Sequence, residues 1–215
     1  MSINILLVSI AVPLIAGVLC LFVKSRGIKE AVAIGVSGFI LVLSIFLFAL
    51  VRTSSLFWSV PWLPLLNISF SLRCNEFSST ILIFVSFFSF ITSLYSFSSM
   101  RKFPRVKEFY GYFLWVLAAS WGVVLADNLV VLLLFWGALG VLLYGFLSFG
   151  SFRLSTKGIF TVGVGDFSFI LGALFLSRLA GSLNMGEITG INLTGALPLA
   201  AFILLTTGVI AKIGA

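Results

Sequence analysis

Two charged residues, Asp166 and Lys212, stand inside long apolar runs of the sequence. Asp166 lies about two turns into the run that starts at residue 158, roughly 13 Å deep at 1.5 Å per residue. Lys212 lies within the run 197–215. A charge near mid-bilayer costs about 2.5–3.5 kcal/mol, so it normally faces a partner or a water-filled path. Lys212 is also compatible with snorkelling to the membrane surface. A buried lysine that a nearby carboxylate switches between charged and neutral forms has the chemistry of a proton relay.

Small residues surround Asp166. Gly165, Ser168 and Gly172 fall on nearly one face of a helix and would let another helix approach closely. Helix packing is the simpler interpretation of these glycines. The pair Gly163 and Gly165 does not indicate a nucleotide-binding loop, because it follows no strand and lies in an apolar run.

The composition requires a membrane environment for these residues. Hydrophobic residues make up 61% of the chain and charged residues 9%, whereas soluble proteins carry about 25% charged residues. There is no histidine, and the two cysteines, Cys20 and Cys74, lie far apart, which excludes thiol redox motifs and histidine or cysteine metal sites. The net charge of +7 is spread over small groups, which argues against nucleic-acid binding. We therefore expect no cofactor, no metal and no catalytic residue.

The apolar runs predict an all-α membrane protein with about seven transmembrane helices. The predicted helices are 4–23, 31–51, 79–97, 109–126, 128–149, 158–178 and 196–215. Segment 55–74 contains Pro61 and Pro64 and then alternates polar with apolar residues, which predicts a short extended or hairpin element on the membrane surface. The glycine-rich residues 181–195 predict a flexible loop.

Basic residues predict the orientation. The loops after the first, third and fifth helices hold nine Lys or Arg residues, and the loops after the second, fourth and sixth hold three, Arg52, Arg73 and Arg178. By the positive-inside rule, the N-terminus lies outside and the nine-residue side faces the cytoplasm or matrix.

Four stretches, in order, resemble the antiporter-like membrane subunits of respiratory complex I, Mrp antiporters and membrane-bound hydrogenases. They are Asn75–Ser96, Val124–Trp136, Lys157–Asp166 and Gly208–Lys212. The resemblance implies a fold of about fourteen helices with two inverted repeats. It also implies that 1–215 is one transmembrane domain, in which 1–108 hold three leading helices and the surface element. Residues 109–215 would hold an incomplete first repeat that ends within the seventh helix.

The sequence departs from that family at two positions. Gly137 stands where the family has a glutamate, and Gly163 stands where it has an arginine. Lys212 therefore lacks the carboxylate that the family supplies, and either loses its proton or pairs with Asp166 where packing permits.

The resemblance implies a membrane subunit of a complex I-like or Mrp-like assembly that carries part of a proton or Na⁺ pathway. Lys212 would be the relay lysine, Asp166 its carboxylate and Lys157 a group on the uptake side. Such a chain is a non-redox subunit of a NADH:quinone oxidoreductase-type or related translocase, without catalytic chemistry of its own. Two alternatives stay open: an inactive structural subunit descended from a pump, and a self-contained small transporter.

The same resemblance implies the surroundings of the chain. Its partners would be other membrane subunits, including a chain that supplies the missing second half, together with lipid. It would lie in an energy-converting membrane, either a bacterial or archaeal plasma membrane or a mitochondrial inner membrane.

Overall fold

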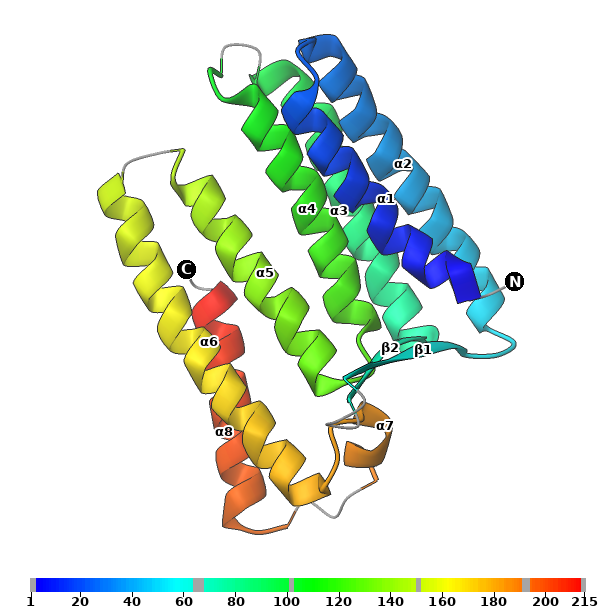
Figure 1. Ribbon diagram of the computed structural model, residues 1–215, viewed down its shortest axis with the longest axis vertical. Coiled ribbons are helices and arrows are strands. Elements are labelled where there is room, and N and C mark those ends of the chain that lie inside the picture. The colour runs from blue at the N-terminus through cyan, green and yellow to red at the C-terminus, as the bar shows by residue number, and fades with distance from the viewer. Residues whose placement is uncertain (1–2, 64–67, 101–102, 150–151, 191–193, 214–215) are drawn as a thin grey trace. The chain divides into compact units, whose positions relative to one another are not determined.

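The computed structural model describes residues 3–63, 68–100, 103–149, 152–190 and 194–213 (Figure 1). Within these residues, seven helices are long and apolar enough to cross a membrane. They are α1 (Ile3–Phe22), α2 (Arg26–Val51), α3 (Glu76–Ser99), α4 (Val106–Leu125), α5 (Leu129–Leu147), α6 (Phe152–Ala180) and α8 (Ala196–Ile213). The chain is an all-α, multi-pass membrane protein, which confirms the fold class predicted from hydropathy.

Two helices begin five or six residues earlier than the hydropathy pattern predicts. α2 starts at Arg26 instead of residue 31, and Arg26 Nε donates a 2.6 Å hydrogen bond to Glu30 Oε1 one turn later. α6 starts at residue 152 instead of 158, although its apolar span runs from Gly158 to Ala180. Polar residues without proline do not stop a helix, so these helices extend beyond the apolar segment.

The surface element is a two-stranded sheet of β1 (Leu56–Leu63) and β2 (Ile68–Cys74). The predicted hairpin is therefore present between α2 and α3. The predicted loop 181–195 contains a one-turn helix, α7 (Met185–Ile188), which sequence patterning did not indicate. Glycines at 181 and 195 adopt φ angles of 63° and 117°, in the left-handed region that glycine allows without a steric penalty.

The chain divides into two compact units, residues 1–59 with 71–126, and residues 60–70 with 127–215. These units are defined by packing, so the predicted division of the repeats at residue 108 stays a prediction. In the first unit α1 packs on α4 and α2 packs on α3. Trp115 Nε1 donates to the carbonyl of Leu14, and Trp121 Nε1 donates to the hydroxyl of Ser86. Hydrogen bonds between helices hold this unit together in addition to apolar packing.

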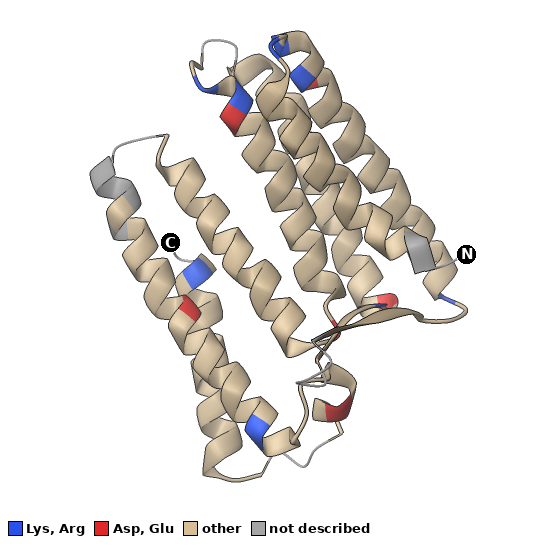
Figure 2. Cartoon of the chain, in the orientation of Figure 1, with Lys and Arg blue, Asp and Glu red and all other residues tan. Residues whose placement is uncertain are grey.

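The second unit contains the two intramembrane charges. α6 packs mainly on α8 and, less extensively, on α5. The start of α5 is tied to the loop after α6, because the Leu129 N–H donates to the carbonyl of Leu183 at 2.9 Å. In Figure 2 most charged segments lie at helix ends, including a blue segment at the C-terminal end of α8, whereas a red segment lies within α6. The inside–outside orientation stays a prediction.

Candidate functional site

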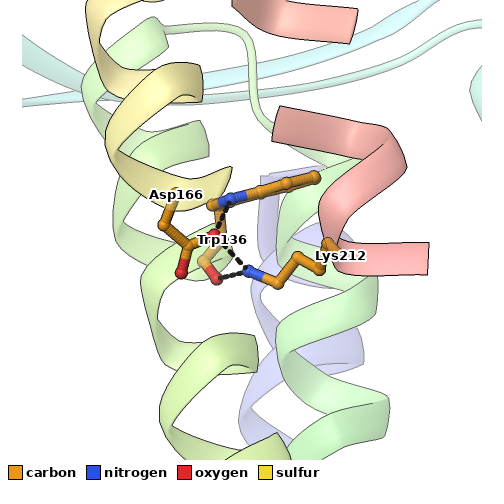
Figure 3. Close-up of polar contacts among 3 residues, drawn as sticks. All are labelled: Trp136, Asp166 and Lys212. Atoms are coloured by element: carbon orange, nitrogen blue, oxygen red, sulfur yellow. Dashed lines mark hydrogen bonds and ion pairs between the residues drawn. The ribbon is translucent and has the colours of Figure 1, made fainter. Parts of the chain in front are cut away.

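Three helices of the second unit each contribute one residue to a polar cluster: Trp136 from α5, Asp166 from α6 and Lys212 from α8 (Figure 3). Lys212 Nζ donates to Asp166 Oδ1 at 3.1 Å and to the backbone carbonyl of Trp136 at 2.7 Å. Trp136 Nε1 donates to the same carboxylate oxygen, Asp166 Oδ1, at 2.6 Å. The two charges predicted from the sequence are therefore partners, and Lys212 does not snorkel away from the protein.

Small residues let α6 and α8 approach closely enough to form this pair. A Cβ atom at Gly165 would lie 2.5 Å from the Cβ of Ala211, and one at Gly172 would lie 2.7 Å from Leu205 Cγ. Ser168, on the same face, donates its hydroxyl to the carbonyl of Leu204 at 2.9 Å. Close backbone contact through small residues and interhelical hydrogen bonds is how membrane helices associate. The glycines are therefore packing residues that position Asp166.

Trp136 is the residue of the cluster whose role the sequence did not indicate. Its ring stacks on Phe169 with a centroid distance of 4.2 Å and an interplanar angle of 8°. Lys212 Nζ lies 4.2 Å from the centroid of the Trp136 ring, within the range of a cation–π interaction. The tryptophan thus contacts the amine with both its ring and its carbonyl, and contacts the carboxylate with its indole N–H.

The carboxylate of the cluster lies deep in α6, and Lys212 reaches it from the last turn of α8. Asp166 is the middle residue of α6, with residues 152–165 before it and 167–180 after it. The side chains of Lys212 and Asp166 are 13% and 22% exposed. A single charge at this depth is costly, but a hydrogen-bonded amine and carboxylate form a pair with no net charge.

Asp166 keeps one carboxylate oxygen available. Among the described residues, Oδ2 accepts no hydrogen bond, while Oδ1 accepts two. Oδ2 faces Gly140, where a Cβ atom would lie 2.9 Å from Oδ2 and 3.6 Å from Lys212 Nζ. The absence of a side chain at Gly140 therefore gives the pair the space it occupies, and leaves Oδ2 as the atom that can take up a proton.

The remaining predicted site residues are Lys157, Gly137 and Gly163. The side chain of Lys157 falls outside the part of the chain that the structure describes, so its role stays a prediction. A Cβ atom at Gly137 or at Gly163 would meet nothing within 4 Å. Neither position therefore resists a side chain sterically. In the described residues, no group of three or more histidine, cysteine or acidic side chains could hold a metal ion.

No protein-family profile matches the sequence, but individual proteins do. The chain is 26% identical over 156 residues to Na⁺/H⁺ antiporter subunit A1 of Staphylococcus haemolyticus, which covers 68% of this chain and 19% of that protein. It is 25% identical over 184 residues to NADH-ubiquinone oxidoreductase chain 5 of Wickerhamomyces canadensis, which covers 81% of this chain and 29% of that protein.

A solved structure resembles the whole fold. The Mrp complex from Dietzia sp. DQ12-45-1b contains a chain that superposes with a TM-score of 0.80 at 17% identity, over 96% of this chain and 23% of that chain. This chain therefore spans less than a third of the length of each of these three proteins.

Proposed function

We propose that this chain, a relative of the antiporter-like membrane subunits of Mrp antiporters and respiratory complex I, is a membrane subunit of an ion-translocating assembly. The observation that carries the proposal is the ion pair of Lys212, in the last turn of α8, with Asp166 at the middle of α6. Ionisable residues at this depth line proton and ion pathways. The proposal includes neighbouring membrane subunits, among them a chain that supplies the rest of the fold.

The chemistry of the pair suits a proton relay better than direct Na⁺ binding, because an ammonium group repels a metal cation. Lys212 Nζ holds the proton and gives it to the next group of the pathway. The loss of that positive charge leaves the Asp166 carboxylate without its cation, which favours uptake of a new proton at Oδ2 or at Nζ. Trp136 keeps Nζ and the carboxylate in contact range throughout.

Ion translocation by the reconstituted assembly tests this proposal. Lys212→Ala is expected to abolish translocation in proteoliposomes, because no other amine in the described part of this unit contacts Asp166. Lys107→Ala is the matched control, since Lys107 is exposed at the start of α4 and is expected to leave translocation unchanged. Undiminished translocation in Lys212→Ala would overturn the proposal.

Gly137 favours a second candidate function, an inactive structural subunit. The resemblance places a glutamate at this position, and glycine carries no proton. Gly137→Glu separates the two functions: the space around Gly137 admits a side chain, so the variant is expected to fold. An assembly that translocates only after Gly137→Glu would establish the structural subunit. Translocation that is already present with glycine at position 137, and that Lys212→Ala removes, supports the relay.

A further inference from the structure

A polar cavity lies at the C-terminal end of α6. It has a volume of about 800 Å³ and is lined by Asn128, Leu174, Ser177, Arg178, Gly181, Ser182, Leu183 and Asn184. Arg178 supplies its only charge, and within the described chain no carboxylate pairs with this guanidinium. Asn128, 1% exposed, donates its side-chain N–H to Asn184 Oδ1 at 3.2 Å and so fixes one wall. We call this space the polar cavity.

An apolar groove lies further along the same helix. It has a volume of about 500 Å³ and is lined by Thr156, Ile159, Phe160, Gly163, Val164 and Phe167. The groove is open at Gly163, where a Cβ atom would meet nothing within 4 Å. Phe160 is 75% exposed and Phe167 62% exposed, so this surface faces outward from the described helices. We call this space the apolar groove.

Exposed apolar side chains join the two spaces. Leu174 and Ile170 are exposed between Arg178 and Phe167. At about 100° per residue, these positions fall within about 80° of one another on α6, and Gly163 falls in the same sector. One helix face therefore presents a guanidinium at its end, an apolar stripe below it and an apolar groove beyond.

The dimensions match one leaflet of a bilayer. Arg178 and Phe167 are eleven residues apart, roughly 16 Å along a helix with a rise of 1.5 Å per residue. The hydrocarbon core of a bilayer is about 30 Å thick, so one leaflet spans about 15 Å. A molecule with an anionic group in the polar cavity would place its hydrocarbon chain along the stripe and end it at the Phe167 edge of the apolar groove.

We propose that this face of α6 is a binding site for one phospholipid, with the phosphate on Arg178 and an acyl chain that ends at the Phe167 edge of the apolar groove. A guanidinium is well suited to bind phosphate oxygens. Glu187 accepts hydrogen bonds from Asn184, at 3.3 Å, and from Ser182, two residues that line the cavity. Glu187 therefore places a negative charge next to residues that line the cavity, while Arg178 lines it, which matches a headgroup with an amine and a phosphate.

Photolabelling of the full chain in detergent micelles tests the proposal. The probe is a phosphatidylethanolamine with a diazirine at the terminal end of one acyl chain, and labelled peptides are mapped by mass spectrometry. We expect labels in 160–167 that fall at least about threefold in Arg178→Gln, the scale of an exposed ionic contact. Arg178→Lys should retain most of the labelling. The matched control is Arg52→Gln, which removes another exposed arginine at a helix end.

Gly163→Leu tests the apolar end independently. A leucine fills the groove and is expected to move the label out of 160–167, whereas Gly35→Leu, also in open space within a membrane helix, should leave the label in place. Circular dichroism and gel filtration confirm that each variant is folded. If one of these two substitutions fails to fold, the other still decides the result.

Three results would overturn the proposal. Labelling of 160–167 that neither Arg178→Gln nor Gly163→Leu reduces would show that the face is coated by unspecific lipid. Equal labelling by a diacylglycerol probe without phosphate would show that Arg178 plays no part. Complete competition by inorganic phosphate or glycerophosphoethanolamine would show an anion site that does not need the acyl chain.

Discussion

The ion pair of Lys212 with Asp166 should be worth more than an ion pair on a protein surface. Asp166→Asn keeps the shape and the acceptor oxygen but removes the negative charge, and Lys212→Met removes the positive charge with little change in volume. Each single substitution leaves one half-buried charge without its partner. The double substitution leaves neither charge, so its cost should be much smaller than the sum of the two single costs.

The magnitude follows from the geometry. At 3.1 Å and an effective dielectric constant of about 20, the attraction between the two charges is about 5 kcal/mol before desolvation is subtracted. Removal of one partner of a buried pair costs about 3–5 kcal/mol. Because the side chains are 13% and 22% exposed, we expect about 2–4 kcal/mol for each single substitution and a coupling energy of about 2–3 kcal/mol.

Reversible unfolding of the full chain in mixed micelles with increasing SDS, followed by circular dichroism, measures these free energies. The four proteins of the cycle are compared at one pH and one lipid composition. A coupling energy below about 0.5 kcal/mol, the value of exposed pairs, would refute the argument that this pair is a desolvated unit. Equal and additive costs of the two single substitutions would refute it too.

Three further outcomes follow from single residues. Gly140→Ala should destabilise the chain by about 1–3 kcal/mol in the same assay, since its Cβ would lie 2.9 Å from the Asp166 carboxylate. Gly137→Ala, where a Cβ meets nothing within 4 Å, should be nearly neutral. Equal costs of the two substitutions would contradict this. Trp136→Phe should cost about 1.5–3 kcal/mol, because it removes the N–H donated to a charged acceptor but keeps the ring; a cost below about 0.5 kcal/mol would contradict the 2.6 Å contact. Burial raises the pKa of the Cys74 thiol to about 11, so its thiolate is scarce below that pH. Maleimide should therefore label Cys74 slowly at pH 7.5 until SDS unfolds the chain. Fast labelling of the folded chain, measured by peptide mass spectrometry, would contradict this.

The sequence predicted most of the elements because membrane residence leaves few choices. Each apolar run of about twenty residues has to form a helix, since the lipid cannot hydrogen-bond the backbone. The small residues Gly165, Ser168 and Gly172 also predicted the face through which another helix approaches α6, and α8 packs there. Spacing on one helix was sufficient for that prediction, because it concerns which residues share a face.

The role of Trp136 could not be predicted in this way. Spacing gives the face of α5 on which a residue lies, but not the rotation of α5 relative to α6, nor the rotamer that aims the indole N–H at Asp166. The partner of Lys212 was left open for the same reason, because the pairing depends on how closely α6 and α8 pack. The signal available in the sequence was a tryptophan beside a position where the resemblance expects a carboxylate.

Trp136 changes the meaning of the glycine at position 137. A relay lysine needs partners that keep its ammonium group in place in both protonation states of the neighbouring carboxylate. Asp166 holds the charged amine, but a carboxylate that becomes protonated loses much of its attraction for an ammonium group. The Trp136 carbonyl at 2.7 Å and the ring face at 4.2 Å do not titrate, so they hold the ammonium whichever form Asp166 takes. In the proposed relay, the neutral Trp136 thus positions the Lys212 ammonium without a carboxylate at position 137.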